Sequence, residues 1–409
     1  MSEQERIFVH DGSQPGSPAI ATVFANHRRG VLTTTFRYND EYIASPNAWP
    51  VGPGFALGAQ SVSQGLPGPL ADTAPDRWGR NLIDKRIRAQ WSNEDGVRIG
   101  GAHKAITEVD YLLGVSDLTR QGALRYRVAG EESFLAPDSN IPRLIDLPRL
   151  LNATERVDSG GEAEMQAIKD LLDAGSASLG GARPKASVRT ANRLLLAKFP
   201  HNTDSWNVMA WEATALDLAA AVGIAVPEHR LLLVNGRSVL LLDRFDRRGS
   251  ARIPFISGMT LTGKFDGEAA DYVEVAEAMS ENCDRVATNL RELWMRIAFS
   301  VAINNTDDHL RNIGFLHANK GWSLAPLFDV NPNPNTLTAR VTSIGWQTNP
   351  TSELASLLAV APYFGLTETT CMQMWSHIQA GIANWSQVAK SNGIVAAEIE
   401  QFAPIFESG

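Results

Sequence analysis

Residues 1–130 alternate short β-forming stretches with segments rich in glycine and proline. Residues 31–36 read V-L-T-T-T-F, which favours a strand, whereas 48–58 contain three glycines and two prolines, which favour a loop. Apolar residues at helical spacing predict one helix over 76–89 and another over 162–174. The pattern therefore predicts a strand-rich beginning that carries a few helices.

The middle of the chain predicts a strand, a helix and a hairpin in succession. Residues 193–199 (R-L-L-L-A-K-F) have the length of a strand, and apolar residues at intervals of three and four predict a helix over 208–222. Asn235-Gly236 separates two apolar runs at 231–234 and 238–242. This dipeptide favours a type I′ turn, because both central positions of that turn need positive φ.

The last third of the chain has a helical pattern. An apolar stripe marks a helix over 290–301, and further helices are expected over 352–360, 367–383 and 395–407. The expected fold class is α+β, with a mixed α/β N-terminal part and an all-helical C-terminal part. The expected division is a β-rich part, an α/β part and a helical part, at 1–135, 136–250 and 251–409.

Composition and charge restrict the class of protein. Hydrophobic residues make up 44% of the 409 residues and charged residues 20%, which excludes a disordered or collagen-like chain. A net charge of -8 makes direct wrapping of nucleic acid a poor expectation. Only Cys283 and Cys371 are present, so no disulfide framework is expected. With no apolar run of membrane-spanning length and no signal-peptide pattern, we expect a soluble cytoplasmic protein without membrane contact.

The densest polar cluster is N-N-T-D-D-H-L-R-N at 304–312. Asp307 and Asn312 stand five residues apart, which is the interval between the catalytic aspartate and the metal-binding asparagine in the D-x-x-x-x-N loop of protein kinases. Asp329 follows after a short hairpin-like stretch and suits a second Mg²⁺ ligand. Taken alone, the spacing also fits a solvated loop or a helix cap.

Upstream residues occur in the order that a nucleotide site requires. Lys198 ends an apolar strand, as the phosphate-binding lysine of kinases does, and Glu212 on the next helix could pair with it. Singly, these positions also fit a strand-end lysine and an exposed helix residue. Gly180, Gly181, Ala182 and Lys185 belong to a loop of small residues that could approach phosphates, although it also fits a plain loop. Asp243 and Phe245 follow the hairpin in a segment that could bind adenine, although it also fits a charged end of a strand.

Two other functions remain open on these residues. One is a catalytically silent kinase-fold module that acts only by binding a partner. The other is a metal-dependent hydrolase with a site of Asp307, Asp308, His309 and Asp329, although adjacent ligands converge poorly on one metal.

These motifs, in this order, resemble the HipA family of bacterial type II toxin–antitoxin serine/threonine kinases. The resemblance covers nearly the whole chain. Its most specific part is N-T-D-D-H-L-R-N at 305–312 followed by Phe328-Asp329, and it includes P-D-R-W-G-R at 75–80, S-L-G-G-A-R-P-K at 178–185 and L-D-R-F-D-R at 242–247. It implies an atypical kinase fold, ATP and Mg²⁺ as cofactors, and a helix-turn-helix antitoxin partner (HipB-like). It also implies an aminoacyl-tRNA synthetase substrate, such as glutamate-tRNA ligase, growth arrest or persistence, and DNA contact only through the antitoxin.

The resemblance also assigns roles to residues. Asp307 matches the catalytic aspartate, Asn312 and Asp329 match the Mg²⁺ ligands, and Lys198 matches the ATP-binding lysine. Asp243 and Phe245 match the adenine hinge, 178–185 match the phosphate-binding loop, and Ser178 matches a position of autophosphorylation that switches the kinase off. His309 follows the catalytic aspartate, whereas the corresponding histidine of eukaryotic kinases precedes it. Arg311 is expected either to stabilise phosphate oxygens or to pair with a nearby acid.

Overall fold

The structure, a computed structural model, describes residues 4–14, 16, 18–28, 30–94, 105–135, 141–157, 160–178, 181–318, 321–348 and 353–407. The chain forms two compact units. The first contains Met1–Asn202 and Asp246–Phe255, and the second contains Thr203–Phe245 and Ile256–Gly409. The units therefore differ from the three predicted parts 1–135, 136–250 and 251–409, because the chain leaves the first unit, returns to it for one short segment and leaves again.

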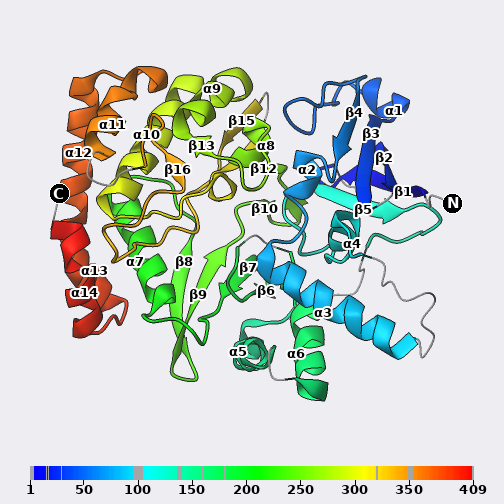
Figure 1. Ribbon diagram of the computed structural model, residues 1–409, viewed down its shortest axis with the longest axis horizontal. Coiled ribbons are helices and arrows are strands. Elements are labelled where there is room, and N and C mark those ends of the chain that lie inside the picture. The colour runs from blue at the N-terminus through cyan, green and yellow to red at the C-terminus, as the bar shows by residue number, and fades with distance from the viewer. Residues whose placement is uncertain are drawn as a thin grey trace. The chain divides into compact units, whose positions relative to one another are not determined.

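An antiparallel sheet of five strands forms the beginning of the first unit (Figure 1). Its order is β4 (Gln60–Gln64), β3 (Val31–Tyr38), β2 (Ala19–Arg28), β1 (Gln4–Asp11) and β5 (Leu124–Val128). Side chains on one face of these strands, including Ile7, Val9, Val23, Phe36 and Tyr126, are buried in one core. The strand predicted at 31–36 is confirmed. The short helices α1 (Asp40–Ile43), α2 (Gly68–Ala71) and α4 (Glu108–Leu113) lie in the connections.

Three longer helices and two hairpins complete the first unit. The helices are α3 (Arg77–Glu94), α5 (Leu147–Arg156) and α6 (Gly161–Asp173), and their apolar faces share a core around Leu82, Ile168 and Leu171. The helices predicted at 76–89 and 162–174 are thus confirmed. One hairpin pairs β6 (Lys185–Arg189) with β7 (Leu194–Lys198), and the other pairs β10 (Arg247–Arg248) with β11 (Ala251–Arg252).

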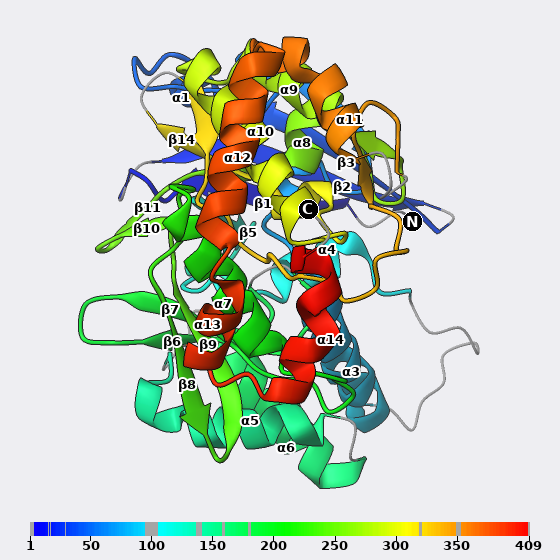
Figure 2. The same cartoon turned by 90° about the vertical axis from the view of Figure 1, so that its left-hand side faces the viewer.

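The second unit begins with a buried helix and a hairpin. Helix α7 (Val208–Ala221) is buried along most of its length, and Figure 2 shows α12 (Glu368–Ile382) and α13 (Trp385–Ser391) beside it. Strands β8 (His229–Val234) and β9 (Arg237–Asp243) pair as predicted. At the turn Asn235 has φ 48 and Gly236 has φ 78, so both positions have the positive φ that Asn-Gly accommodates.

The remaining helices of the second unit are α8 (Gly258–Thr262), α9 (Tyr272–Asn282), α10 (Val286–Ala302), α11 (Glu353–Ala359) and α14 (Ala396–Glu407). All four helices predicted in the last third are confirmed. The expectation of an all-helical C-terminal part is too broad, because β14 (Gly314–Ala318) pairs with β15 (Gly321–Leu324) and β13 (Ala270–Asp271) pairs with β16 (Thr342–Ser343). β12 (Phe255–Ser257) is a further short strand. None of the described helices has the length and hydropathy that crossing a bilayer requires.

Candidate active site

The polar loop that follows α10 is fixed by hydrogen bonds from its own asparagines. Asn304 has φ 52, which turns the chain out of the helix. Its Nδ2 donates to the carbonyl oxygens of Asn333 at 2.6 Å and Asn335 at 3.2 Å, and the amide of Asn305 donates to Ser300 O at 2.8 Å. The loop therefore has one fixed backbone path before it reaches the two aspartates.

Asp307 and Asp308 are adjacent in sequence but have different surroundings. Asp307 is exposed, whereas Asp308 is buried and accepts a hydrogen bond of 2.5 Å from the Tyr272 hydroxyl. The Thr342 hydroxyl donates to the carbonyl oxygen of Asp308 at 2.6 Å. Burial raises the pKa of Asp308, while the Tyr272 hydrogen bond and the Arg340 charge oppose the rise. Of the two acids, only Asp307 can contact a substrate directly.

Asn312 is held against the same loop. Its Nδ2 donates to the carbonyl oxygen of Asp307 at 3.2 Å, and its backbone amide donates to His309 O at 2.8 Å. Because an amide is planar, the side-chain oxygen of Asn312 points away from that carbonyl and can face a cation. The five-residue spacing thus closes one compact turn.

Asp307 and Asp329 act on each other electrostatically. Partial burial raises the pKa of Asp307; the His309 imidazole opposes this rise, and the carboxylates of Asp329 and Asp308 add to it. Carboxylates that disfavour each other's charge create a place where a divalent cation is favoured. Among the described residues no group of three or more His, Cys, Asp or Glu could hold a metal. One carboxylate and one amide oxygen, from Asp329 and Asn312, are nevertheless a donor set that fits Mg²⁺, which usually keeps several waters and binds nucleotide phosphates.

The backbone at Asp329 has φ 55, which lies in the left-handed region that residues other than Gly, Asn and Asp rarely adopt. The preceding residue, Phe328, packs against Phe245 with ring centroids 5.4 Å apart. Within the second unit, the predicted adenine hinge and the predicted metal ligand are therefore neighbours.

Arg340 and Tyr272 support the loop, and both were missed by the sequence analysis. Arg340 is buried, and it donates to the Glu353 carboxylate at 2.7 Å and to the carbonyl oxygen of Asn305 at 2.7 Å. A further support, Asn333, donates to the Thr306 hydroxyl at 3.0 Å, and for this residue the repeated N-P-N-P-N at 331–335 was an available signal.

The two remaining candidates of the loop, Arg311 and His309, differ in their contacts. Arg311 forms an ion pair with Asp266, the second of the two outcomes expected for it. His309 Nδ1 is buried and has no hydrogen-bond partner among the described residues.

In the first unit, Lys185 and Lys198 are paired across the β6–β7 hairpin. Only 2% of Lys185 and 6% of Lys198 is exposed. The cross-strand register thus brings two basic residues to the same end of the hairpin.

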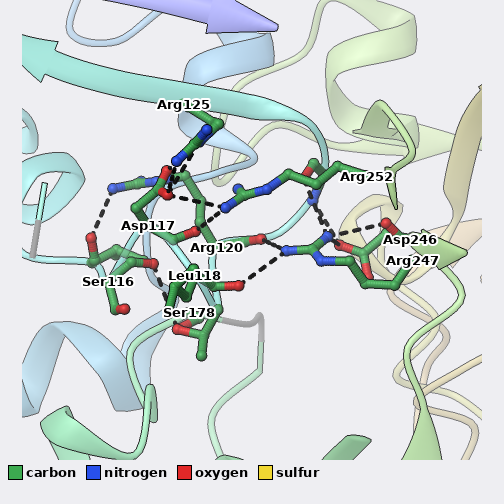
Figure 3. Close-up of polar contacts among 12 residues, drawn as sticks. Ser116, Asp117, Leu118, Arg120, Arg125, Ser178, Asp246, Arg247 and Arg252 are labelled. Carbon is green, nitrogen blue, oxygen red and sulfur yellow. Dashed lines mark hydrogen bonds and ion pairs between the residues drawn. The ribbon is translucent and has the colours of Figure 1, made fainter. Parts of the chain in front are cut away.

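The small-residue loop before this hairpin is partly described. Ala182 is exposed, and the amide of Gly181 donates to the Asp76 carboxylate, whereas Gly180 lies outside the described residues. Ser178 is buried, and its hydroxyl is hydrogen-bonded to Gly175 O at 2.7 Å and to the Thr119 hydroxyl (Figure 3).

The predicted site residues are distributed over both units. Glu212 is fully buried on α7, so it is not an exposed helix residue. The second unit contains Glu212, Asp243, Phe245, Asp307, Asn312 and Asp329, and the first contains Ser178, Gly181, Ala182, Lys185 and Lys198. The structure thus joins the metal-binding and hinge candidates in one unit, while the pairing of Lys198 with Glu212 stays a prediction.

Comparison with known proteins gives one family match and two curated relatives. The family model of the HipA-like C-terminal domain matches residues 177–386. A protein of Sinorhizobium fredii named as a candidate kinase, Y4mE, is 29% identical over 146 residues, which are 33% of this chain and 33% of that protein. A candidate kinase of Haemophilus influenzae is 25% identical over 142 residues, which are 30% of this chain and 41% of that protein. The matches thus span less than half of either relative.

A solved structure matches over almost the entire length. It is a chain in the complex of the toxin–antitoxin proteins HipA and HipB with operator DNA from Shewanella oneidensis. The match has a TM-score of 0.68 at 14% identity and covers 98% of this chain and 95% of that chain. At this identity the likeness shows the fold, and it confirms the predicted α+β, HipA-like fold class.

Proposed function

This chain belongs to the HipA family, and from that premise we propose that it is an ATP- and Mg²⁺-dependent serine/threonine kinase and the toxin of a toxin–antitoxin pair. The observation that carries the proposal is the contrast between the two acids of the loop. Asp307 is exposed and held in one turn with Asn312, while Asp308 is buried against Tyr272. A loop built in this way presents one carboxylate to a hydroxyl and one amide oxygen to a cation.

In the proposed reaction Asp307 orients the serine or threonine hydroxyl and accepts its proton. The hydroxyl oxygen forms a bond to the γ-phosphorus as the bond to the β-phosphate oxygen breaks, and ADP leaves with that electron pair. Asn312 and Asp329 would hold Mg²⁺, which neutralises charge on the phosphates. Phosphoryl transfer needs alignment and charge neutralisation more than covalent chemistry from the protein, so a rigid loop is the main requirement.

The nucleotide-binding roles of individual residues are proposals that follow the family resemblance. Lys198, paired with Glu212, would contact the α- and β-phosphates, and two buried lysines in register support an anion site at this hairpin. The loop residues Gly180, Gly181, Ala182 and Lys185 would approach the phosphates. Asp243 and Phe245 would contact the adenine, and the packing of Phe245 on Phe328 supports a hinge beside the metal ligand.

The partners are also proposals. The matched Shewanella structure contains HipA, HipB and operator DNA, which supports a HipB-like antitoxin here and DNA contact through it. We further propose that the substrate is an aminoacyl-tRNA synthetase, such as glutamate-tRNA ligase. Its phosphorylation would slow translation in the cytoplasm and cause growth arrest or persistence. Phosphorylation of Ser178 would switch the kinase off.

The first experiment is incubation of the purified protein with ATP and Mg²⁺, followed by intact-mass measurement and peptide mapping. The expected result is one added phosphate on the wild type and on a Glu277→Gln control, which changes an exposed acid of α9, and none on Asp307→Asn. Equal phosphorylation of Asp307→Asn would show that Asp307 is not the catalytic residue.

Calorimetry with ATP, combined with a transfer assay on synthetase substrates, separates the kinase from its main alternative. That alternative is a silent kinase-fold module that acts as an antitoxin-bound co-repressor on DNA, and it would bind ATP without transferring phosphate to itself or to synthetase substrates. The hydrolase alternative is disfavoured because Asp308 is buried and hydrogen-bonded to Tyr272 instead of facing Asp307.

A further inference from the structure

Ser178 is buried beneath a turn formed by residues 116–122. Figure 3 shows Ser178 beside Leu118 of this turn, and the hydroxyls of Thr119, within the turn, and Ser178 are hydrogen-bonded to each other. Gly175 has φ 67, and the Thr119 side chain lies so close to its Cα that a Cβ on residue 175 would overlap that side chain. With 2% of Ser178 exposed, its hydroxyl cannot reach a nucleotide while Thr119 stays in place.

The turn itself is fixed by buried arginines. The Arg120 guanidinium donates to three carbonyl oxygens, of Thr73 at 2.9 Å, Leu112 at 2.8 Å and Val115 at 2.9 Å. Because each of these bonds lies in a buried, low-dielectric environment, breaking them to move the turn is costly.

A second set of contacts reaches the turn from the segment 246–252. Arg247 donates to Arg120 O at 2.6 Å, and the Asp246 carboxylate accepts from the amide of Gly122 at 2.7 Å. Arg252 donates to Asp117 O at 2.7 Å and to its carboxylate at 3.1 Å (Figure 3). Asp246 directly follows Phe245, the last residue of the proposed adenine hinge, so the hinge and the turn are joined by a short, hydrogen-bonded stretch of chain.

We propose that the 116–122 turn controls the reactivity of Ser178, with Thr119 as the positioning residue and the 246–252 segment as the support of the turn. The Thr119 hydrogen bond keeps the Ser178 hydroxyl inside until the turn moves. Once Ser178 Oγ has exchanged its proton for the γ-phosphoryl group of ATP, the added dianion is larger than the space that the close contact of Thr119 with Gly175 leaves beside Ser178, so the turn must move. The claim that Ser178 is phosphorylated rests on the proposed function. The mechanical claim, that the Thr119 hydrogen bond keeps Ser178 closed, does not.

Hydrogen exchange without nucleotide tests the mechanical part. The amides of Ser176 and Ser178 donate to Leu171 O at 2.9 Å and Gly175 O at 3.1 Å, so their exchange reports opening around Ser178. Thr119→Val, which keeps the shape and removes the hydroxyl, should raise exchange in 175–178 about fivefold to tenfold, and Thr119→Ser should leave it unchanged. Thr34→Val is the matched control, because Thr34 is also fully buried and donates to a carbonyl, that of Gly65 at 2.6 Å, within the sheet.

Arg247→Met tests the support from the 246–252 segment and should raise exchange in the same 175–178 region. If this variant does not fold, the Thr119→Val and Thr119→Ser pair still decides the inference. Unchanged exchange in Thr119→Val, or an equal rise in Thr119→Ser, would overturn it.

The initial rate of Ser178 phosphorylation, read by peptide mapping with ATP and Mg²⁺, should rise in Thr119→Val and not in Thr119→Ser. A wild type that never gains phosphate would refute the proposed autophosphorylation, while hydrogen exchange would still decide whether Thr119 keeps Ser178 closed. Phosphorylation at equal rates in all variants would show that the turn does not limit the reaction.

Discussion

Asp329 combines a left-handed backbone, φ 55, with the position of a proposed metal ligand. Glycine adopts this conformation without strain, whereas a Cβ costs about 1–2 kcal/mol there, with Asp and Asn somewhat better tolerated. We expect the free energy of unfolding of the Asp329→Gly variant to be about 1 kcal/mol higher than that of the Asp329→Ala variant. Both variants should lose phosphoryl transfer. Urea denaturation measures the difference, and equal stabilities would show that the backbone there is unstrained.

Tyr272 has a structural role beneath the loop. Tyr272→Phe removes the donor to the buried Asp308 carboxylate and should lower the free energy of unfolding by about 1–3 kcal/mol. Tyr363→Phe is the control, because Tyr363 is 55% exposed, and it should leave stability unchanged. Phosphorylation at saturating ATP should persist in folded Tyr272→Phe, and its complete loss would instead give Tyr272 a direct part in the chemistry.

At the residue scale, local spacing was informative and distant support was not. The interval from Asp307 to Asn312 could be predicted because one turn of loop brings both side chains together. Tyr272 and Arg340 come from remote parts of the sequence, and only tertiary packing makes them neighbours of Asp308 and Asn305. Nothing in their local sequence distinguishes them from other buried polar residues.

At the element scale, a polar network connects α7 to β8 and to the end of α13. Asp217 on α7 is 3.1 Å from His229 Nε2, and it accepts from Asn392 Nδ2 at 2.8 Å. The hydrogen bond with Asp217 raises the pKa of His229. Partial burial alone would raise the pKa of Asp217, but the hydrogen bonds from His229 and Asn392 outweigh it and the pKa is lowered.

These shifts give a pH dependence with a definite sign. The stability contributed by charged His229 is fully present below its ordinary pKa and is lost as pH rises through its higher folded-state pKa. The free energy of unfolding should therefore fall between pH 6 and pH 8, by about 0.5–1 kcal/mol for a partly exposed pair. His229→Gln should remove that part of the decline and His27→Gln should not, as denaturation at the two pH values would show. An unchanged decline in His229→Gln would assign it to other groups.

Arg340 joins the 304–312 loop to Glu353, the first residue of α11. Arg340→Met would leave the buried Glu353 carboxylate without its cation and should cost about 3–5 kcal/mol. Adding Glu353→Leu should restore part of this loss, because the double variant buries no unpaired charge. A double-mutant cycle measured by urea denaturation gives the coupling energy, and strictly additive effects would contradict the pairing.

The elements themselves were largely predictable. The Asn235-Gly236 dipeptide fixed its hairpin through local conformational preference, and helices with a long apolar stripe, such as α10, were confirmed. Short strands such as β13 and β16 were missed, because two residues carry no periodic pattern and pair only after distant segments meet.

At the scale of the whole molecule, the first unit is built from two separate stretches of chain. A protein ending at residue 202 lacks Arg247 and Arg252, so Asp117 and the carbonyl oxygens of the 116–122 turn lose buried partners. We expect residues 1–202 alone to unfold without a cooperative transition. Joining 246–255 to them through a flexible linker should restore cooperativity, as calorimetry would show, and cooperative unfolding of 1–202 alone would make the returning segment dispensable.

The division into units could not be predicted, because it depends on which distant segments pack together. The expected boundaries follow residues 135 and 250, whereas the chain changes unit after residues 202, 245 and 255.

The discontinuity of the first unit has a consequence for synthesis on the ribosome. Ser178 and the 116–122 turn emerge well before Arg247 and Arg252, since all of Thr203–Phe245 is translated in between. During that interval the nascent chain has Thr119 and Arg120 but not Arg247 and Arg252, which hold the turn from the returning segment. The support of Ser178 is thus completed only after the proposed hinge has left the ribosome and before the loop with Asp307 has been made, so it is in place before the chain acquires its proposed catalytic residue.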